Sequence, residues 1–280
     1  MSGRAEFRVK LWGVRGTVAC PGSTTRRFGG NTSCVEVRCG PHQLILDAGT
    51  GLRVLGNAMA AADGQRQRAH ILLSHTHLDH VMGLPFFKPA YEAQNCFEFW
   101  AGHLRPRGRT LQEVLGRLME PPYFPVPLDI MHACIGFHDF EAGEVFEPFP
   151  GVRVRTAPLV HPGGATGYRI EYDGRAVCYV TDTEHPERGH DERVLELIAG
   201  AGLVIYDCTY TDAEMPRFRG WGHSTWQEGV RLCERAGARR LVTFHHDPER
   251  DDTALDHIDA ELGERRPGSL VGREGMVLEP

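Results

Sequence analysis

The chain has 280 residues, of which 41% are hydrophobic and 24% are charged, as is usual for a globular protein. A chain of this length can bury a large core without disulfide or metal staples, so we expect any bound metal to serve chemistry and not folding. The formal charge is −6, and residues 105–109 form the one dense basic stretch, which argues against a large nucleic-acid footprint. A small anionic substrate stays compatible with this charge, because a metal site supplies positive charge of its own.

The sequence also predicts a cytoplasmic protein. Its first residues run straight into a strand pattern without a signal-peptide core, and no apolar run approaches the roughly 18 residues of a membrane span. The eight cysteines include no C-x-x-C pair, and several lie in strand-like runs. We therefore expect reduced cysteines that pack as small hydrophobic residues.

Strand and helix patterns alternate along the chain. Runs rich in valine and isoleucine predict strands, and periodic runs with capping residues predict helices. In the first half we expect strands over 7–12, 32–38 and 43–46, a helix over 52–62 that Gly64 closes, strands over 70–74 and 97–100, and a helix over 110–119. In the second half we expect strands over 152–155, 167–172 and 176–180, a helix over 191–198, a strand over 203–206, a helix over 226–235, a strand over 240–244 and a helix over 253–262.

This order predicts an α/β fold in a single domain, residues 1–280, with two mixed β-sheets packed together and flanked by helices as an αββα sandwich. The stretch 119–135 is expected to be irregular and lid-like, because it is rich in proline, which removes hydrogen-bond donors and fixes φ. A doubly wound dinucleotide-binding fold is the competing architecture. It is rejected because the run after the strand at 43–46 lacks the third glycine of the fingerprint.

One short segment carries the chemistry. Directly after a predicted strand, six positions hold four potential metal ligands, namely His75, His77, Asp79 and His80. A lone histidine is more often a core or surface residue than a ligand, but such a cluster is hard to explain by packing. Imidazole nitrogen and carboxylate oxygen suit zinc, and the absence of cysteine ligands favours an open catalytic site. His75 and His77 alternate to one face and can reach one ion, whereas Asp79 and His80 can face a second ion.

The segment resembles the H-x-H-x-D-H signature of the metallo-β-lactamase superfamily, and the resemblance extends over nearly the whole chain. It implies the fold of that superfamily and three further ligands at strand ends, His161, Asp182 and His245. By this resemblance, one ion takes His75, His77 and His161, the other takes Asp79, His80 and His245, and Asp182 is shared. The doublet His245-His246 leaves the last ligand open, since adjacent residues on a strand face opposite ways; spacing favours His245.

A second resemblance narrows the reaction. Gly222-His223-Ser224-Thr225 is similar to a segment of ribonuclease Z and related phosphodiesterases, where the histidine donates to the phosphate or protonates the leaving oxygen. Ribonuclease Z supports this histidine with an acidic residue, and Asp207 stands in its place here, where it would orient His223 and hold it protonated. The expected catalytic residues are therefore His223, Asp79 and Asp207. The alternative is that His223 is an ordinary residue of a surface loop.

The chain departs from ribonuclease Z in two respects. The run that contains Asp207 lacks the histidine and glutamate of that family, and no long basic arm for gripping tRNA is apparent. The segments 28–33, 161–164, 220–223 and 244–248 are closer to smaller relatives that hydrolyse cyclic nucleotides or other small phosphodiesters, some as dimers. We therefore expect a small phosphodiester substrate, first of all a 3′,5′-cyclic nucleotide. We expect no membrane partner and no large nucleic-acid footprint, and a homodimer is compatible with the sequence.

The expected enzyme is a binuclear metal-dependent hydrolase. Two divalent ions, zinc first with manganese or iron as alternatives, would activate a bridging hydroxide to attack phosphorus while His223 serves as general acid. Asp47 is a candidate anchor behind the metal loop, with a plain turn role equally compatible, and Glu184 and His185 are further candidates for such support. Candidates for stacking on a base are Tyr123, Phe124 and the two tryptophans near His223, Trp221 and Trp226.

Other functions stay open at this point. They are a ribonuclease Z-like endonuclease that processes RNA 3′ ends, a metal-dependent hydrolase of esters, thioesters or lactones, a di-iron redox enzyme, and a non-catalytic binding module. The histidines not expected to be catalytic are His42, His70, His103, His132, His138, His185, His190 and His257.

Overall fold

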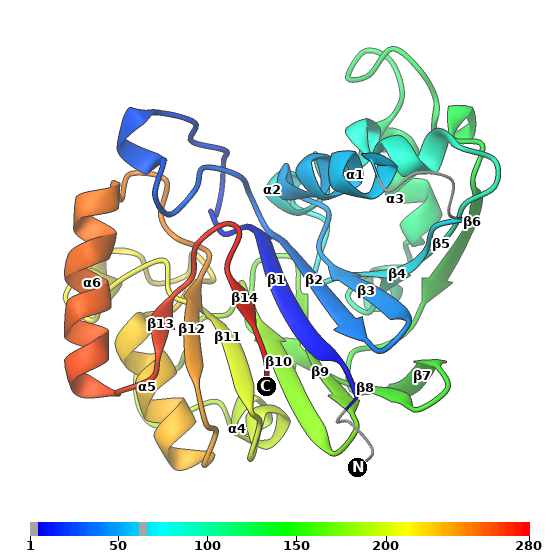
Figure 1. Cartoon of the computed structure of the whole chain (residues 1–280). Helices are drawn as coiled ribbons and strands as arrows, with labels where there is room; N and C mark the ends of the chain where they lie inside the picture. Colours follow the sequence, from blue (N-terminus) through cyan, green and yellow to red (C-terminus); the bar gives the residue numbers. More distant parts are fainter. Residues whose placement is uncertain (1–4, 62–65) are drawn as a thin grey trace.

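The chain forms four layers, with two β-sheets face to face in the middle and helices on both outer sides (Figure 1). The computed structural model describes residues 5–61 and 66–280. The arrangement confirms the predicted α/β sandwich of two mixed sheets flanked by helices. Ala62 and Gly64, which the sequence assigns to the end of the first helix, lie outside the described residues.

The first sheet comes from the N-terminal half of the chain and a short return near its end. Its order is β14-β1-β2-β3-β4-β5-β6. The strands β14, β1, β2 and β3 pair antiparallel, and β4, β5 and β6 continue from β3 in parallel. Their bounds are β1 Phe7–Gly13, β2 Cys34–Cys39, β3 His42–Leu46, β4 Arg68–Leu73, β5 Cys96–Ala101, β6 Cys134–Asp139 and β14 Val277–Leu278.

The second sheet repeats this plan with the C-terminal half. Its order is β13-β12-β11-β10-β9-β8-β7. The strands β7 to β10 pair antiparallel, and β10 to β13 pair in parallel. Their bounds are β7 Val145–Phe149, β8 Val152–Leu159, β9 Ala165–Tyr172, β10 Arg175–Val180, β11 Leu203–Asp207, β12 Leu241–Phe244 and β13 Leu270–Val271.

Helices connect the parallel strands. The α-helices are α1 Gly51–Ala61, α2 Leu78–Val81, α3 Leu111–Leu118, α4 Glu192–Ile198, α5 Trp226–Arg235 and α6 Asp252–Arg265. Four of them begin at a residue whose side chain accepts a hydrogen bond from a backbone N–H of the first turn: Thr110, Asp191, Thr225 and Asp251. Such caps satisfy donors that have no partner inside the helix, and they fix where each helix starts.

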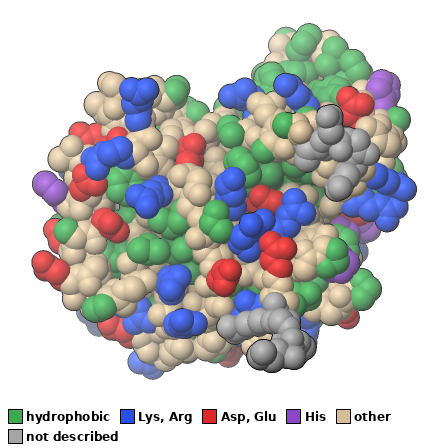
Figure 2. All heavy atoms as spheres, in the orientation of Figure 1, with side chains coloured by type: hydrophobic (Ala, Val, Ile, Leu, Met, Phe, Trp, Pro, Cys, Tyr) green, Lys and Arg blue, Asp and Glu red, His purple; other side chains and the backbone are tan. Residues whose placement is uncertain are grey.

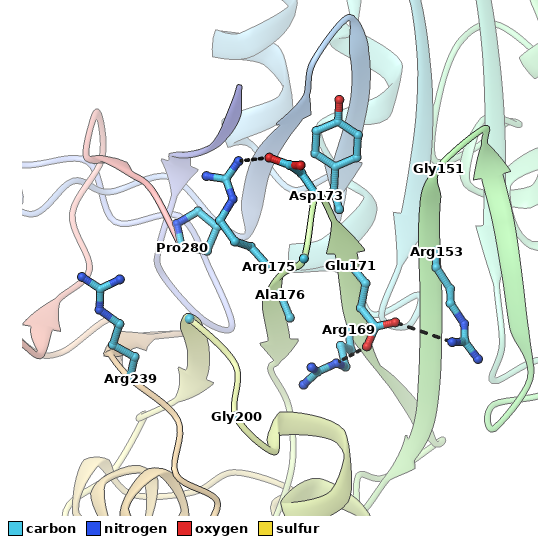
Figure 3. Close-up of a pocket in the computed structure, with 13 residues that line it drawn as sticks. Gly151, Arg153, Arg169, Glu171, Asp173, Arg175, Ala176, Gly200, Arg239 and Pro280 are labelled. Carbon is cyan, nitrogen blue, oxygen red and sulfur yellow. Dashed lines mark hydrogen bonds and ion pairs between the residues drawn. The ribbon is translucent and has the colours of Figure 1, made fainter. Parts of the chain in front are cut away.

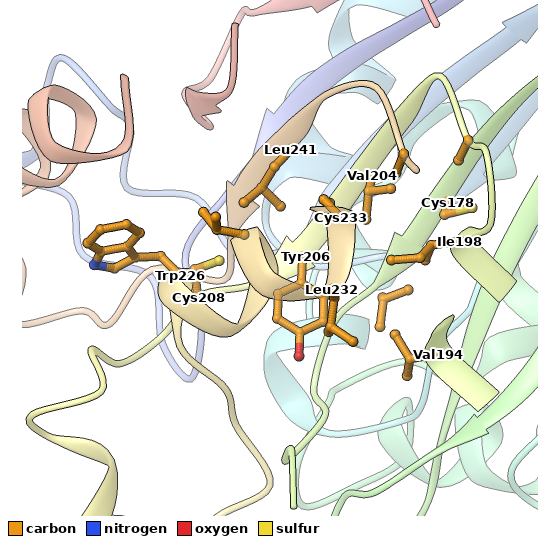
Figure 4. Packing of buried hydrophobic residues seen from close by; sticks show 14 of the residues in the cluster. Cys178, Val194, Ile198, Val204, Tyr206, Cys208, Trp226, Leu232, Cys233 and Leu241 are labelled. Atoms are coloured by element: carbon orange, nitrogen blue, oxygen red, sulfur yellow. The ribbon is translucent and has the colours of Figure 1, made fainter. Parts of the chain in front are cut away.

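Alternation along the strands divides the core into three layers. In β11, Leu203 and Ile205 face the space between the sheets, whereas Val204 and Tyr206 face the outer helices, as the two-residue period of a strand requires. Figure 4 shows Tyr206 and Val204 with Ile198 of α4 and Leu232 of α5 in this outer layer. Leu44, Leu46 and Leu72 belong to the layer between the sheets. The two sheets are thus held together over a continuous apolar layer.

The strands that the sequence analysis missed lie at sheet edges. β6 and β7 are edge strands with partly exposed side chains, and β7 contains Pro148, so neither has the buried valine and isoleucine pattern. β13 and β14 are only two residues long, too short to leave a pattern. Between α3 and β6 the chain is irregular apart from a single 3-10 turn, Leu128–Ile130.

The surface mixes both charges. On the face shown in Figure 2, lysine and arginine are interspersed with aspartate and glutamate, and hydrophobic side chains gather on the protruding segment after α3. Tyr123, in that segment, is 83% exposed. All eight cysteines are unpaired, and five of them are buried. Within the described residues, no helix has the length and apolar character needed to cross a membrane.

Candidate metal centre

Seven side chains converge where strands of both sheets end. They are His75 and His77 after β4, His161 after β8, Asp182 after β10, His245 after β12, and Asp79 and His80 on α2. These strands include the parallel ones of each sheet, whose carboxyl ends share one edge. The structure therefore brings together every residue that the sequence nominated as a ligand, although their numbers span 170 positions.

The first group consists of three histidines. The ligand atoms of His75, His77 and His161 lie within 4.8 Å of one another. His161 Nε2 is 3.1 Å from His77 Nδ1. Asp182 Oδ1 faces this group at 3.9 Å from His75 Nε2 and 3.8 Å from His161 Nε2.

The second group lies on the other side of Asp182. His80 Nε2 is 3.3 Å from His245 Nε2, and both nitrogens approach Asp79 Oδ2, at 3.1 and 3.2 Å. Asp182 contributes here as well, with Oδ2 at 3.2 Å from His80 Nε2 and Oδ1 at 3.3 Å from His245 Nε2. Asp182 is thus the one carboxylate that faces both groups.

His246 points elsewhere. Its side chain is buried, and its Nε2 donates a hydrogen bond to the Gly272 carbonyl at 2.8 Å. His245 occupies the position in the cluster, with a left-handed backbone at φ 58°. The two adjacent side chains therefore face opposite ways. Of the two histidines that the sequence left open as the last ligand, His245 is the one that lies in the cluster.

Backbone strain is concentrated at this site. Among the described residues, five that are not glycine have positive φ, and four of them belong to the centre or its wall: Thr17, Asp47, Asp182 and His245. A non-glycine residue in this region is unfavourable and persists only where the surrounding structure imposes it. The strain aims these side chains at positions that a regular strand would not reach.

The outer nitrogen of four imidazoles is engaged by the protein. His75 Nδ1 meets Ser74 Oγ at 3.1 Å, His161 Nδ1 donates to the Gly222 carbonyl at 2.9 Å, and His245 Nδ1 meets Thr209 Oγ1 at 3.1 Å. His80 Nδ1 lies 2.8 Å from Asp47 Oδ2. Such contacts fix ring orientation and leave the inner nitrogen with a free lone pair.

Asp47 is an anchor behind the centre. Besides His80, its carboxylate accepts hydrogen bonds from Ser74 N at 2.7 Å, Ser74 Oγ at 2.8 Å and the Tyr179 hydroxyl at 2.7 Å. These bonds join the ends of β3, β4 and β10 beneath the ligands. Asp47 therefore supports the metal loop, one of the two roles that its sequence position allowed.

Ionisable side chains shift one another's pKa values strongly in this centre. Burial would raise the pKa of Asp182, but His245, His80 and His75 outweigh it and hold this pKa well below its usual value. Asp79 shows the same balance, with burial opposed by His80 and His245, and its pKa is also lowered. Burial lowers the pKa of His75 well below its usual value, which keeps that imidazole neutral and able to ligate. His80 differs, because Asp79, Asp182 and Asp47 outweigh burial and raise its pKa well above its usual value. In the metal-free centre a proton on His80 therefore offsets part of the carboxylate charge, and a bound cation would take the place of that proton.

The donor set fits divalent metal ions. His75 Nε2 is buried and has no hydrogen-bond partner among the described residues. Because His161 donates through Nδ1 to a carbonyl, its Nε2 carries a lone pair and faces another ring nitrogen at 3.1 Å. Several lone pairs and two carboxylates thus point at one another. A cation between them would turn this repulsion into coordination. His75, His77 and His161 would hold one ion, Asp79, His80 and His245 another, and Asp182 would serve both.

His223 stands beside the ligands with a carboxylate behind it. Its Nδ1 lies 2.9 Å from Asp207 Oδ2 and 3.8 Å from Asp182 Oδ1. Burial lowers the pKa of His223, but Asp207, Asp182 and Asp79 outweigh it and raise that pKa to about 9. The contact with Asp207 thus favours the protonated ring, and because it engages Nδ1, Nε2 is the nitrogen left to face a ligand. Asp207 in turn accepts the backbone N–H of Asp182 at 2.9 Å.

Glu184 holds the loop that carries His223. Its Oε2 accepts the backbone N–H of Gly220 at 2.7 Å and of Gly222 at 3.0 Å. His185 Nδ1 and Ser224 Oγ are joined by a hydrogen bond of 2.7 Å. Both residues therefore support the loop from behind, as their closeness to Asp182 in sequence led us to expect.

A cavity of about 580 Å³ opens over the centre. Its walls are Thr17, His77, Leu78, Asp79, His161, Pro162, Asp182, Thr209, Tyr210, Phe218, Trp221, His223, His245, Asp247, Pro248 and Glu249. Of the four aromatic residues proposed for base stacking, only Trp221 lines it. Trp226 is buried in the outer core (Figure 4), and Tyr123 and Phe124 lie on the segment after α3. These three residues do not line the cavity, because Trp226 is packed in the core under α5 and Tyr123 and Phe124 belong to an irregular segment outside the cavity wall.

Sequence reasoning missed several residues of this site. Thr17 N donates to Asp79 Oδ2 at 2.8 Å, Tyr179 binds Asp47, and Tyr210 and Phe218 line the cavity. Thr17, Tyr210 and Phe218 are not near a ligand in sequence, and none of the missed residues has a residue type that suggests metal binding. The one available signal was the position of Tyr179 on the strand that leads to Asp182.

A second hollow, of about 490 Å³, is lined by arginines (Figure 3). It lies away from the metal ligands, around Arg153, Arg169, Arg175 and Arg239. Arg153 and Arg169 are paired with Glu171, and Arg175 with Asp173. Glu171 and Asp173 thus neutralise part of the positive charge of the four arginines.

The sandwich and the histidine–aspartate centre at its strand ends define the class to which the chain belongs: the metallo-β-lactamase fold. Residues 42–246 match the family model for the Beta-lactamase superfamily domain, and the chain is a member of this superfamily. Proteins similar to it include hydrolases, which supports an enzyme, and its histidine–aspartate cluster is compatible with metal binding.

Three known proteins illustrate the similarity. Ribonuclease Z of Mycobacterium marinum is 28% identical over 240 residues, which cover 76% of this chain and 78% of that protein. A solved diphosphatase of the PhnP family superposes with a TM-score of 0.72 at 17% identity, covering 98% of both chains. Zinc-bound PqqB from Methylobacterium extorquens superposes with a TM-score of 0.71 at 19% identity, covering 98% of this chain and 100% of that chain. The structural likenesses show the shared fold.

Proposed function

We propose that this protein is a two-metal phosphodiesterase for small phosphodiesters, with 3′,5′-cyclic nucleotides as the first substrates to test. The observation that supports the proposal is the pair Asp207–His223: His223 Nδ1 lies 2.9 Å from Asp207 Oδ2 and 3.8 Å from Asp182 Oδ1, so a proton-donating imidazole would stand beside the metal ligands. Hydrolysis of a thioester has less need of such a proton donor, because a thiolate leaves more readily than an alkoxide. The ribonuclease Z relatives and the diphosphatase neighbour support phosphoryl chemistry.

In this proposal, the residues of the site have distinct roles. When bound, two divalent cations, zinc in the first instance, would draw charge from the phosphoryl oxygens and lower the pKa of a water molecule. Asp207 accepts a hydrogen bond from His223 Nδ1–H and keeps the ring oriented. His223 can then give its Nε2 proton to the departing alkoxide, a contribution of about 10²–10⁴-fold for general acids. The ligand imidazoles are kept in position by Asp47 and by the backbone carbonyl of Gly222.

The charges on the cavity wall favour a small substrate over a polyanion. No lysine or arginine is among its wall residues, and Asp247 and Glu249 lie at it. A polyanion such as RNA gains affinity from clustered basic side chains and loses it near carboxylates. A diester with one negative charge needs no more positive charge than the cations provide. A ribonuclease Z-like activity is the second candidate, and the sequence relatives favour it.

Turnover by the zinc-reconstituted protein tests the proposal. We would compare 3′,5′-cyclic AMP, bis(p-nitrophenyl) phosphate and a tRNA with a 3′ extension. Cleavage of the first two and not of the tRNA is expected. Cleavage of the tRNA alone would establish the second candidate, and cleavage of none of them would overturn both.

The role of His223 has a sharper test. His223→Ala should slow cyclic AMP hydrolysis by about 10²-fold or more. The same substitution should slow the hydrolysis of bis(p-nitrophenyl) phosphate much less, because p-nitrophenolate is a good leaving group that needs no proton. His257→Ala, on the exposed side of α6, is the matched control. An equal loss on both substrates would show that His223 acts on the centre and not as a proton donor.

A further inference from the structure

Three aromatic rings form one wall of the cavity over the metal centre. Tyr210 and Phe218 stack in parallel, with centroids 4.2 Å apart and 4° between their planes, and Phe218 meets Trp221 edge to face at 5.4 Å. We call these three residues the aromatic wall. Trp221 is 61% exposed although it lines a cavity. Exposure of so large an apolar ring is unfavourable, and a binding partner that covers it would recover that free energy.

The loop of Trp221 is built to hold the ring in place. The backbone N–H groups on either side of Trp221 donate to the same Glu184 oxygen. Gly220 and Gly222 have φ of 87° and 83°, which side chains rarely adopt. A Cβ at Gly222 would lie 2.2 Å from His161 Nδ1. The loop is thus tied to Glu184 and, through the Gly222 carbonyl, to the ligand histidine His161, so the backbone at Trp221 is held in place before any ligand arrives.

The wall also adjoins the proton donor. Trp221 is separated from His223 by one residue, and the Tyr210 ring lies 6.0 Å from the His223 ring. A phosphodiester at the centre would thus have the wall next to the side from which its alkoxide departs. Planar stacking geometry suits a heterocycle, since stacking on an aromatic side chain tolerates every base.

We propose that the aromatic wall binds a nucleobase attached to the phosphodiester and makes the enzyme selective for nucleotides over sugar phosphates without a base. This inference rests on the proposed function for the identity of the phosphoryl group. Asp247 and Glu249 line the same cavity and offer acceptors to amino and hydroxyl groups of such a ligand. Trp221 is a specificity-determining residue, because it touches the base and not the reacting atoms.

Binding to the zinc-loaded protein tests the wall independently of turnover. Calorimetry with 5′-AMP and with ribose 5-phosphate compares two ligands that share the sugar phosphate and differ in the base. We expect the wild type to prefer 5′-AMP by about tenfold or more, and Trp221→Ala to lose most of that preference while its affinity for ribose 5-phosphate stays within about twofold. Trp221→Phe should restore part of the preference. Tyr123→Ala, a strongly exposed aromatic outside the cavity, should change nothing.

The outcomes separate the two claims. An equal affinity of the wild type for both ligands, no binding of either, or an unchanged preference in Trp221→Ala would overturn the role of the wall. A base preference that depends on Trp221, in a protein that cleaves neither cyclic AMP nor other diesters, would uphold the wall and reject the phosphodiesterase. With cyclic AMP and its abasic methyl riboside analogue as substrates, the same preference should appear in kcat/KM.

Discussion

Asp182 and His245 take left-handed backbone conformations that only the surrounding structure can impose. Close packing against the ligand rings accompanies this strain. Gly16 illustrates it, because a Cβ there would lie 2.3 Å from the His245 ring. At the scale of single residues, the centre therefore depends on small neighbours as much as on the ligands themselves.

We expect Gly16→Ala to fold but to bind metal poorly. The methyl group must push the His245 ring out of position, and displaced ligand geometry typically lowers metal affinity by about 10–100-fold. Zinc titration with a competing chelator measures the effect. Gly116→Ala is the control, since its Cβ meets nothing within 4 Å and the position lies in α3. Wild-type zinc affinity in Gly16→Ala would mean that His245 is free to move or is not a ligand.

Residue patterns and the family resemblance were enough to find the ligands and the supports Asp47, Glu184 and His185, but not Thr17 and Tyr179. The spacing of His75, His77 and His80 is visible because a short loop holds them all. Thr17 and Tyr179 contact the site only through strand ends that are distant in sequence. No local pattern encodes such contacts, so they could be found only once the sheets were assembled.

The elements position the site through the carboxyl ends of their parallel strands. In the first sheet, β3 leads to Asp47 and β4 leads to the histidine loop. In the second sheet, β10 leads to Asp182, β11 ends at Asp207 and β12 leads to His245. These strands are buried and rich in valine, leucine and isoleucine, which is why their positions were predicted closely. The edge strands β6 and β7 escaped prediction because partial exposure and proline weaken that pattern.

The loop between β11 and α5 depends on Glu184. Glu184→Ala should raise the KM for cyclic AMP by about tenfold, because the two loop N–H groups lose a charged acceptor and Trp221 becomes less ordered. Zinc content should stay near the wild-type value. Glu184→Gln retains an acceptor and should restore part of the affinity. Steady-state kinetics with Glu187→Ala as the exposed control measures this; a fall in kcat alone, with KM unchanged, would contradict the positioning role.

One half-buried histidine in the first sheet is expected to make stability depend on pH. His70 Nδ1 accepts a hydrogen bond from Trp100 Nε1 at 3.0 Å, and burial lowers the pKa of His70 to about 4. Because this is below the unfolded value of about 6.5, the neutral ring stabilises the fold above pH 6.5. That contribution is lost as the pH falls from 6.5 toward 4.

The expected size is modest. Between pH 7 and 4.5, the wild type should lose about 1–2 kcal/mol more unfolding free energy than His70→Asn does. Urea unfolding of the metal-free proteins at both pH values measures this difference. His132→Asn, at an exposed position, should behave as the wild type. Parallel pH dependence in His70→Asn and the wild type would assign the effect to other groups.

For the whole molecule, the cations are expected to serve the reaction more than the fold. Three apolar layers hold the sheets and helices together without contributions from the centre. Chelation should therefore abolish hydrolysis and lower the Tm, since a bound ion stabilises only the folded state. The far-UV circular dichroism should persist at 25 °C, and zinc should restore activity. Loss of the spectrum on chelation would make the ions structural.

The division of the chain between the sheets has a consequence for fragment complementation. Apart from β14, the first sheet ends at Asp139 and the second begins at Val145, so a cut in the turn between them separates two nearly complete sheets. One fragment would carry His75, His77, Asp79 and His80, and the other His161, Asp182 and His245. Neither half could catalyse alone. If each half were fused to a different protein, restored hydrolysis would show that the two fused proteins bind each other.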